Sequence, residues 1–320
     1  MKKIASLNIN FDSMCECLKL SEASVQSTEI KDPSFFEIAD RFFALADEFG
    51  AKLTIFVIAQ DLLNKKNLIQ VRRWAESGHE VGNHTFSHPQ NLAELKPNQI
   101  FKEIKKAHDI IGDCIGHAPK GFISPAWSYS PVQAEILTEL KYQYDTSLFP
   151  SFLMPLVQLK LRFKSQVDKT TIPVVRKDLP GSLFGSRQPY FVSKERPWEN
   201  NARAGKLLML PLPVTRWRIP IWHSMSFICQ KAHYEKALNS ALDTSTSFYY
   251  LMHPADLVDP EKDCNHLNPM IKSIERFNIP ISQKIANLRN ALKIISRKSI
   301  FVTMSKLAHD QKEVLNGRTN

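Results

Sequence analysis

The chain has 320 residues, of which 43% are hydrophobic and 23% are charged, and its formal net charge is +10. This composition excludes an intrinsically disordered chain and is sufficient for one large α/β domain or two smaller ones. A basic chain can bind nucleic acid, an anionic membrane or an anionic substrate, but no RNP-like, zinc-finger or helix-turn-helix pattern supports nucleic acid.

Short apolar runs alternate with amphipathic segments along the first 142 residues. Strands are expected at 3–11, 51–61 and 79–84, with a strand and loop at 120–130. Helices are expected at 34–50, 67–78, 96–116 and 131–142. The run at 51–61 is continuously apolar, as a parallel strand covered on both faces would be. This β-α-β-α order predicts an α/β protein with a largely parallel sheet, either open or closed into a barrel.

The order of elements is harder to read after Pro150. Residues 151–205 contain several prolines and no repeat, so we expect an irregular insertion there. Two more strands are expected at 206–215 and 248–254. The last part, about 268–320, is predicted to be mostly helical. We therefore expect a single domain over 1–320.

The N-terminus and the cysteines indicate the compartment. Two lysines open the sequence, but no apolar stretch of signal-peptide length follows, and no run of about 18 apolar residues occurs. The cysteines are scattered and fit neither a disulfide framework nor a C-x-x-C site. They are Cys15, Cys17, Cys114, Cys229 and Cys264. We expect a cytoplasmic protein that starts at Met1.

Polar groups follow the ends of several predicted strands. The segment GHEVGNHTFSHP (78–89) places His84 and His88 four residues apart. On one helical turn, two imidazoles at this spacing can converge on one metal ion at about 2.0–2.1 Å. The first strand ends on Asp12, and Asn10 lies two positions earlier on the same face.

Five segments, taken together and in order, resemble the motifs of the NodB-type polysaccharide deacetylases (carbohydrate esterase family 4). They are LNINFDS, GHEVGNHTFSHP, GFISPAWS, YDTSLFPSF and LMHPADL, between about residues 4 and 257. The resemblance implies a distorted (β/α) barrel with an irregular insertion. It also implies a divalent metal ion, expected to be zinc, and hydrolysis of N-acetyl or similar acyl groups on sugars.

Carried over residue by residue, the resemblance assigns two groups of side chains. Asp12, His84 and His88 would be the metal ligands. His253 would be the general acid that protonates the departing amine, and Asp145 would orient and charge it. The metal would polarise the acyl carbonyl and lower the pKa of a bound water.

The first motif admits two registers. In one, Asp12 is the catalytic base and Ser13 occupies the position of the metal-binding acid. In the other, Asp12 binds the metal and Asn10 replaces the base. We favour the second register because it keeps a complete set of ligands with His84 and His88.

The third motif also lacks a charged residue that the resemblance implies. Ile123 stands where the resemblance implies an arginine that pairs with the base, so Asn10 and Ile123 are interpreted as a paired loss. An amide cannot act as a general base, and losing one costs about 10²–10⁴-fold in rate. Pro125 and Trp127 of the same motif would shape the substrate pocket.

Three functions stay open at this point. The first is a hydrolase of carbon-nitrogen bonds other than peptide bonds, which removes an acyl group from a surface polysaccharide or a lipid-linked sugar. The second is a non-catalytic glycan-binding homologue. The third is an amide hydrolase with a non-sugar substrate. The sugar and the oligomeric state cannot be read from the sequence.

Two segments mix aromatic with basic residues. They are 151–166 and 215–227, and the second contains Trp217 and Trp222 beside arginines. This pattern suits peripheral contact with the inner membrane surface. The alternative is that both are buried elements whose basic side chains extend to solvent.

Overall fold

A nine-stranded sheet forms the centre of the molecule. The computed structural model describes residues 2–14, 16, 32–153, 185–193, 198–200, 205–263 and 275–317. Within these residues the strand order is β6-β7-β5-β4-β3-β2-β1-β8, and β9 also pairs with β1. Every pairing is parallel except β6 with β7.

The elements follow the alternation expected from the sequence. The strands are β1 (Lys3–Phe11), β2 (Leu53–Val57), β3 (Glu80–Asn83), β4 (Gly121–Phe122), β5 (Tyr144–Asp145), β6 (Tyr190–Phe191), β7 (Leu208–Met209), β8 (Phe248–Met252) and β9 (Ser299–Phe301). The α-helices are α2 (Ala39–Asp47), α3 (Lys65–Glu76), α4 (Pro97–Ile115), α5 (Pro131–Glu139), α8 (Lys231–Thr244), α9 (Ile281–Lys298) and α10 (Met304–Gly317). Short 3-10 turns follow several strand ends, among them η2 (Ala59–Leu63), η4 (Pro125–Trp127) and η6 (Pro254–Leu257).

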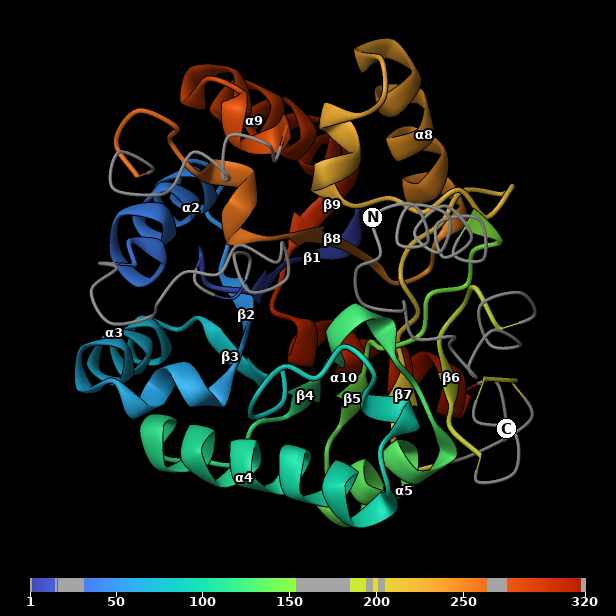
Figure 1. Ribbon diagram of the computed structural model, residues 1–320. Coiled ribbons are helices and arrows are strands. Elements are labelled where there is room, and N and C mark those ends of the chain that lie inside the picture. Colours follow the sequence, from blue (N-terminus) through green and yellow to red (C-terminus); the bar gives the residue numbers. More distant parts are fainter. Residues whose placement is uncertain are drawn as a thin grey trace, which may run out of the picture.

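The curled sheet has helices outside it and one helix within its concave side. In Figure 1, α2, α3, α4, α5, α8 and α9 surround the strands, and α10 lies among them. One core cluster lies between the sheet and α2, α3, α8 and α9. A second lies against α4 and α5. The third fills the concave side, where Phe56 and Tyr144 meet Met304 and Leu307 of α10.

Glu80 fixes the start of α10 at one end of the sheet. The backbone N–H of Ser305 donates to Glu80 Oε2 at 2.7 Å, and Tyr144 Oη donates to Glu80 Oε1 at 2.7 Å. A carboxylate at a helix N-terminus is favourable for the helix dipole. Because Glu80 begins its strand, α10 covers the end of the sheet opposite to the one where the strands finish.

The distorted barrel expected from the sequence is confirmed, with local differences. The expected helix 34–50 divides into a π-helical turn, Ser34–Ile38, and α2. The strand expected at 206–215 is limited to β7, since Pro211 and Pro213 lack the N–H that a ladder requires. No helix among the described residues is long and apolar enough to cross a membrane.

The single domain over 1–320 remains a prediction. Most of the expected insertion at 151–205 lies outside the described residues, as do 264–274 before the C-terminal helices. Of the cysteines, Cys114 and Cys229 are free thiols, and the other three lie outside the described residues.

Candidate metal centre

The ends of three neighbouring strands bring the first-motif and second-motif residues together. One row of paired residues crosses four strands: Phe11, Val57, Asn83 and Phe122. Asp12, His84 and Ile123 each come next in their chains. Because side chains alternate along a strand, these three begin a row that faces the opposite side from the first.

Asp12, His84 and His88 form a triangle of candidate ligand atoms. Asp12 Oδ1 lies 3.2 Å from His84 Nε2 and 3.4 Å from His88 Nε2. All three ligand atoms lie within 4.8 Å of one another. Tetrahedral ligands at about 2.05 Å from a zinc ion are about 3.3 Å apart. The donor set and its spacing therefore fit a divalent metal such as zinc.

The two histidines converge through a bent loop and not through the helical turn expected from their spacing. Thr85 and His88 adopt positive φ values of 67° and 61°. Asn83 Oδ1 accepts the Thr85 N–H at 2.7 Å, and Thr85 Oγ1 accepts the His88 N–H at 3.1 Å. These bonds hold a reversal of the chain that returns His88 to the strand end where His84 lies.

Each imidazole is held by a second contact on its other nitrogen. His84 Nδ1 lies 2.8 Å from the carbonyl oxygen of Ile123. His88 Nδ1 lies 3.1 Å from Glu16 Oε1. Such acceptors fix the tautomer of a metal-binding histidine and orient its Nε2 toward the ion. The sequence analysis did not identify Glu16. The only signal for it is that this acidic residue stands four positions after Asp12.

The electrostatics of the triangle favour an ionised Asp12. Burial by itself would raise the pKa of Asp12, but His88 and His84 outweigh it and hold this pKa below its usual range. For His88, burial lowers the pKa while Asp12 and Glu16 raise it, and the net direction is upward. A metal ion would replace the protons that these groups otherwise share.

Asn10 and Ile123 each contact the triangle through a backbone carbonyl: Asn10 O accepts the Asp12 N–H at 2.9 Å, and Ile123 O lies 2.8 Å from His84 Nδ1. Asn10 is buried, and its Oδ1 has no hydrogen-bond partner among the described residues. Ile123 is fully buried, in the apolar cluster that fills the concave side of the sheet. Ser13 does not join the histidines, and its Oγ accepts the Glu16 N–H at 3.3 Å.

Asp145 is buried and accepts hydrogen bonds from a serine and a glutamine. Its Oδ1 accepts hydrogen bonds from Ser147 Oγ at 2.5 Å and from Ser147 N–H at 2.8 Å, and Gln133 Nε2 donates to Oδ2 at 3.1 Å. The expected role of Asp145 in orienting His253 stays a prediction. Burial raises the pKa of Asp145 to about 6, although these bonds act in the opposite direction. Ser147 Oγ also accepts the Ser124 N–H at 2.8 Å, which ties Asp145 to the third-motif loop.

His253 follows β8 and reaches the same end of the sheet. It is one of the residues that lower the pKa of Asp12, so its side chain belongs to the electrostatic surroundings of the triangle. Its backbone N–H donates to Asp256 Oδ2 at 2.8 Å, and Ser224 Oγ donates to Asp256 Oδ1 at 2.7 Å. Asp256 therefore anchors the turn that carries His253.

Three aromatic rings form a wall next to Ile123. Trp127 packs on Phe149 with ring centroids 4.9 Å apart and on Trp222 at 5.9 Å. Phe149 and Trp222 are 5.8 Å apart. Trp127 has a positive φ of 52° at the end of η4, which begins at the buried Pro125. The sequence identified Trp127 for this wall but not its two partners.

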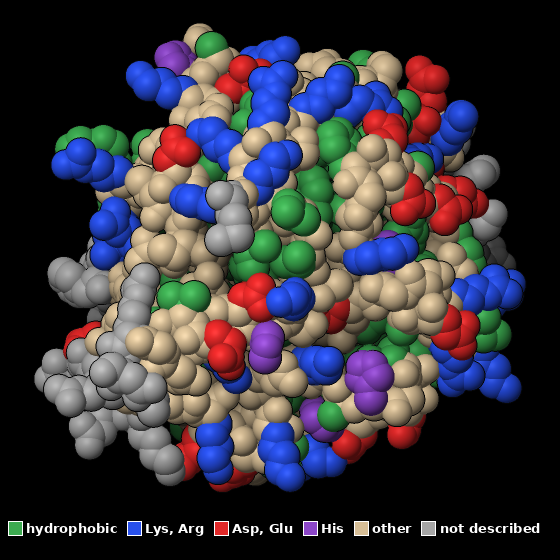
Figure 2. Space-filling view, turned by 180° about the vertical axis from the view of Figure 1, so that it is seen from behind, with side chains coloured by type: hydrophobic (Ala, Val, Ile, Leu, Met, Phe, Trp, Pro, Cys, Tyr) green, Lys and Arg blue, Asp and Glu red, His purple; other side chains and the backbone are tan. Residues whose placement is uncertain are grey.

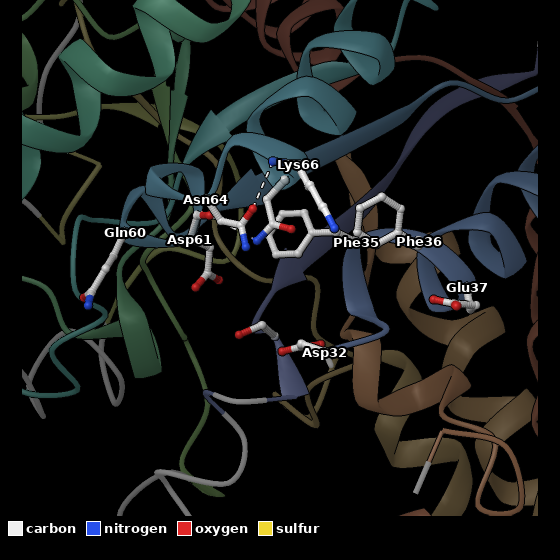
Figure 3. A pocket seen from close by; sticks show the side chains of 10 residues that line it. Asp32, Phe35, Phe36, Glu37, Gln60, Asp61, Asn64 and Lys66 are labelled. Carbon is white, nitrogen blue, oxygen red and sulfur yellow. Dashed lines mark hydrogen bonds between the residues drawn. The ribbon is translucent and has the colours of Figure 1, made fainter. Parts of the chain in front are cut away.

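The described residues also form a cavity of about 710 Å³. Its lining combines aromatic rings with amides and carboxylates: Ser13, Asp32, Phe35, Phe36, Glu37, Gln60, Asp61, Asn64, Lys66 and Asn67. Asp32 and Asp61 approach the same open space from different sides (Figure 3). Asp61 also contributes to raising the pKa of His88. The cavity offers hydrogen-bonding groups, and Ser13 in its lining follows Asp12 directly in the chain.

Part of the chain is similar to proteins of a known family. Residues 33–144 match the family described as polysaccharide deacetylase. An 86-residue stretch is 33% identical to the peptidoglycan deacetylase of Helicobacter pylori and covers 27% of this chain and 29% of that protein. An 80-residue stretch is 36% identical to the peptidoglycan-N-acetylglucosamine deacetylase of Bacillus cereus. It covers 25% of this chain and 28% of that protein. The chain spans less than a third of the length of these relatives.

Solved structures are similar over nearly the whole chain. A Mycobacterium smegmatis protein described as a polysaccharide deacetylase matches with a TM-score of 0.60 at 15% identity, over 99% of this chain and 92% of its own. A Pseudomonas aeruginosa protein described in the same terms matches with a TM-score of 0.56 at 13% identity. The match covers 96% of this chain and 90% of that protein. At these identities the likeness shows the fold.

The family match contains His84, His88 and Ile123, whereas Asp12 precedes it and His253 follows it. The sheet geometry is what joins these outer residues to the matched segment. Residues 33–144 therefore resemble the polysaccharide deacetylase family in sequence, and the fold of the chain is the curled barrel of the NodB type.

Proposed function

We propose that the protein is a metal-dependent hydrolase that removes an acetyl or similar acyl group from the nitrogen of an amino sugar in a glycan. The triangle of Asp12, His84 and His88 carries this proposal, because its spacing fits a zinc-like ion. The names of the curated relatives, which include peptidoglycan deacetylases, support an amino-sugar substrate.

The bound ion would supply Lewis-acid activation of the acyl carbonyl and a water of lowered pKa. The protein's own residues would do the rest. His253 would protonate the departing sugar nitrogen, with its position set by Asp256. The wall of Trp127, Phe149 and Trp222 would exclude water from the side of the acyl methyl group.

Asn10 sets the limit on the rate. In the register that puts Asp12 on the metal, the buried Asn10 Oδ1 occupies the position of the base, and it can accept a hydrogen bond but not a proton. We therefore expect turnover to be slower by about 10²–10⁴-fold than with a carboxylate at this position. The unpartnered Oδ1 is suited to accept a hydrogen bond from a bound water or a substrate N–H.

Asn10 and Ile123 support a second candidate function, glycan binding without hydrolysis. With Asn10 in place of a base and Ile123 in place of an arginine, the site could bind a glycan through its metal and aromatic wall without hydrolysing it. The two proposals predict the same metal content. They differ in acetate release and in its response to restoring the base.

The experiment compares acetate release from N-acetylglucosamine oligomers and from peptidoglycan. It uses wild type, Asn10→Asp, Asn10→Asp with Ile123→Arg, and His84→Ala, each with zinc and after chelation. Zinc-dependent release by wild type that is lost in His84→Ala supports the hydrolase. Release that appears only after Asn10→Asp, alone or with Ile123→Arg, supports the binding protein. No release by any variant, despite bound zinc, contradicts the hydrolase proposal.

A further inference from the structure

The chain between β7 and α8 forms a tight turn that holds a tryptophan in solvent. Val214 pairs with Pro220 in an antiparallel bridge. Thr215 closes the turn twice: its N–H donates to Ile219 O at 2.8 Å, and its Oγ1 accepts the Ile219 N–H at 3.1 Å. Trp217, at the tip, is 72% exposed. We call residues 214–220 the Trp217 turn.

The turn exposes more apolar surface than a folded chain usually leaves on a rigid loop. Ile219 is 38% exposed beside Trp217, and Arg216 Cζ lies 5.7 Å from the Trp217 ring centroid. Single exposed apolar residues need no explanation, but an aromatic ring held on a hydrogen-bonded turn beside a second apolar residue indicates a contact surface. Tryptophan flanked by basic residues is typical of the membrane–water interface.

Three arginines gather at the base of this turn. Arg187 Nη1 donates to the carbonyl oxygen of Arg216 at 2.8 Å. Arg218 Nη1 donates to Pro150 O at 3.2 Å and to Gly185 O at 3.1 Å, which braces the turn against the body of the protein. Burial lowers the pKa of Arg218, and Arg187 adds to this effect, so the like charges lie close together.

These cations have no acidic neighbour to neutralise them within the described residues. None of the ion pairs there involves Arg187, Arg216 or Arg218. The sequence contains no aspartate or glutamate between Glu199 and Glu235. Acidic side chains lie among many of the lysines and arginines on the face shown in Figure 2.

A cavity of about 240 Å³ lies beside the turn. It is lined by Arg187, Gln188, Val214, Arg216, Thr244 and Ser245. This volume is several times the volume that one molecule occupies in liquid water, which is about 30 Å³. Two arginines with neighbouring hydroxyl and amide groups are the chemistry that binds a phosphate group.

We propose that the Trp217 turn binds an anionic phospholipid surface. Trp217 and Ile219 enter the interfacial layer, and Arg187 and Arg216 receive a lipid phosphate in the adjacent cavity. This binding does not depend on the proposed hydrolase activity. It does deepen that proposal, because the same segment continues to Trp222 in the aromatic wall and so brings the site close to a lipid-linked glycan.

The test is flotation of the full chain with vesicles of phosphatidylcholine, with and without phosphatidylglycerol, at low and high salt. Wild type should bind only the anionic vesicles and release them in high salt. Arg216→Gln should weaken binding about fivefold, from one cation lost at the surface. Trp217→Ala should weaken it about tenfold, from lost apolar burial.

Matched controls are available elsewhere on the surface. Leu63→Ala removes an apolar side chain that is 63% exposed, and Lys105→Gln removes an exposed cation of α4. Both should bind like wild type. Failure of wild type to bind anionic vesicles at low salt would overturn the proposal, as would equal losses in Leu63→Ala and Trp217→Ala.

Inorganic phosphate distinguishes the two sources of a phosphate group. Added phosphate should compete only weakly, because Trp217 and Ile219 have no contact with a free ion. Full displacement by phosphate, with Trp217→Ala unchanged from wild type, would show a site for free phosphate and overturn membrane binding. Circular dichroism of each variant verifies that it is folded.

Discussion

On one side of the site, His84 and His88 both direct Nε2 toward Asp12, and an acceptor holds each Nδ1. On the other side, Asn10 Oδ1 is buried without a partner in the described part of the chain, and Ile123 is packed among apolar side chains. In the proposed assignment, the ligand side keeps its supporting contacts, while the side that would transfer the proton lacks a carboxylate. The proposal therefore separates metal binding from proton transfer.

The largest effect should come from removing a ligand. His84→Ala and Asp12→Ala should each abolish stoichiometric zinc binding, because two remaining ligands do not make a closed site. The measurement is zinc bound per chain after dialysis. His117→Ala, which removes an exposed histidine outside the site, is the control and should retain one zinc. Unchanged zinc content in both ligand variants would show that the triangle is not the metal site.

Ile123→Arg tests the reduced side directly. An unpaired charge at this fully buried position should destabilise the protein by about 3–5 kcal/mol. Adding Asn10→Asp should recover about 0.5–3 kcal/mol if the two positions form a pair. Urea unfolding gives both values, and Ile123→Met, which conserves volume, should cost less than about 1.5 kcal/mol. Purely additive losses would contradict the paired replacement.

The pH dependence of stability separates two roles for Asp145. Burial raises its pKa to about 6, from 3.8 for an unperturbed aspartate. Because its pKa is higher in the folded state, protonated Asp145 stabilises the folded protein below about pH 4. This stabilisation, about 3 kcal/mol, is lost as the pH rises to about 6. The difference in stability between wild type and Asp145→Asn should therefore decrease over this range. An increase in this stability difference would mean that a cation, such as protonated His253, holds Asp145 ionised.

Glu16→Gln gives the smallest effect, on the ligand side. It keeps an acceptor for His88 Nδ1 but removes the charge, so zinc affinity should fall about 10–100-fold. Competition with a chelator of known affinity measures this. Glu94→Gln, an acid outside the triangle, should leave the affinity unchanged. If Glu16→Gln binds zinc as wild type does, the Glu16 contact has no role in holding the ion.

The sequence was sufficient for the parts of the fold that depend on local pattern. Apolar runs and helical periodicity gave the alternation of β1 to α5, and the motifs identified Asp12, His84 and His88. It could not give the loop that brings the histidines together, since that loop depends on positive φ values at Thr85 and His88 and on side-chain bonds.

Contacts between distant segments were also beyond the sequence. Glu16 reaches His88 across 72 positions, and no spacing rule predicts such a pair. The contacts of Asp145 with Gln133 and Ser147 could not be read from the sequence either. Trp222 joins Trp127 only because the chain after β7 returns to the strand ends.

The most direct test of the central claim is the crystal structure of the zinc-loaded protein, with anomalous scattering measured at the zinc edge. We expect one strong peak about 2.0–2.2 Å from Asp12 Oδ1 and from Nε2 of both His84 and His88. No peak at the triangle, or a peak held by His253 in place of Asp12, would contradict it.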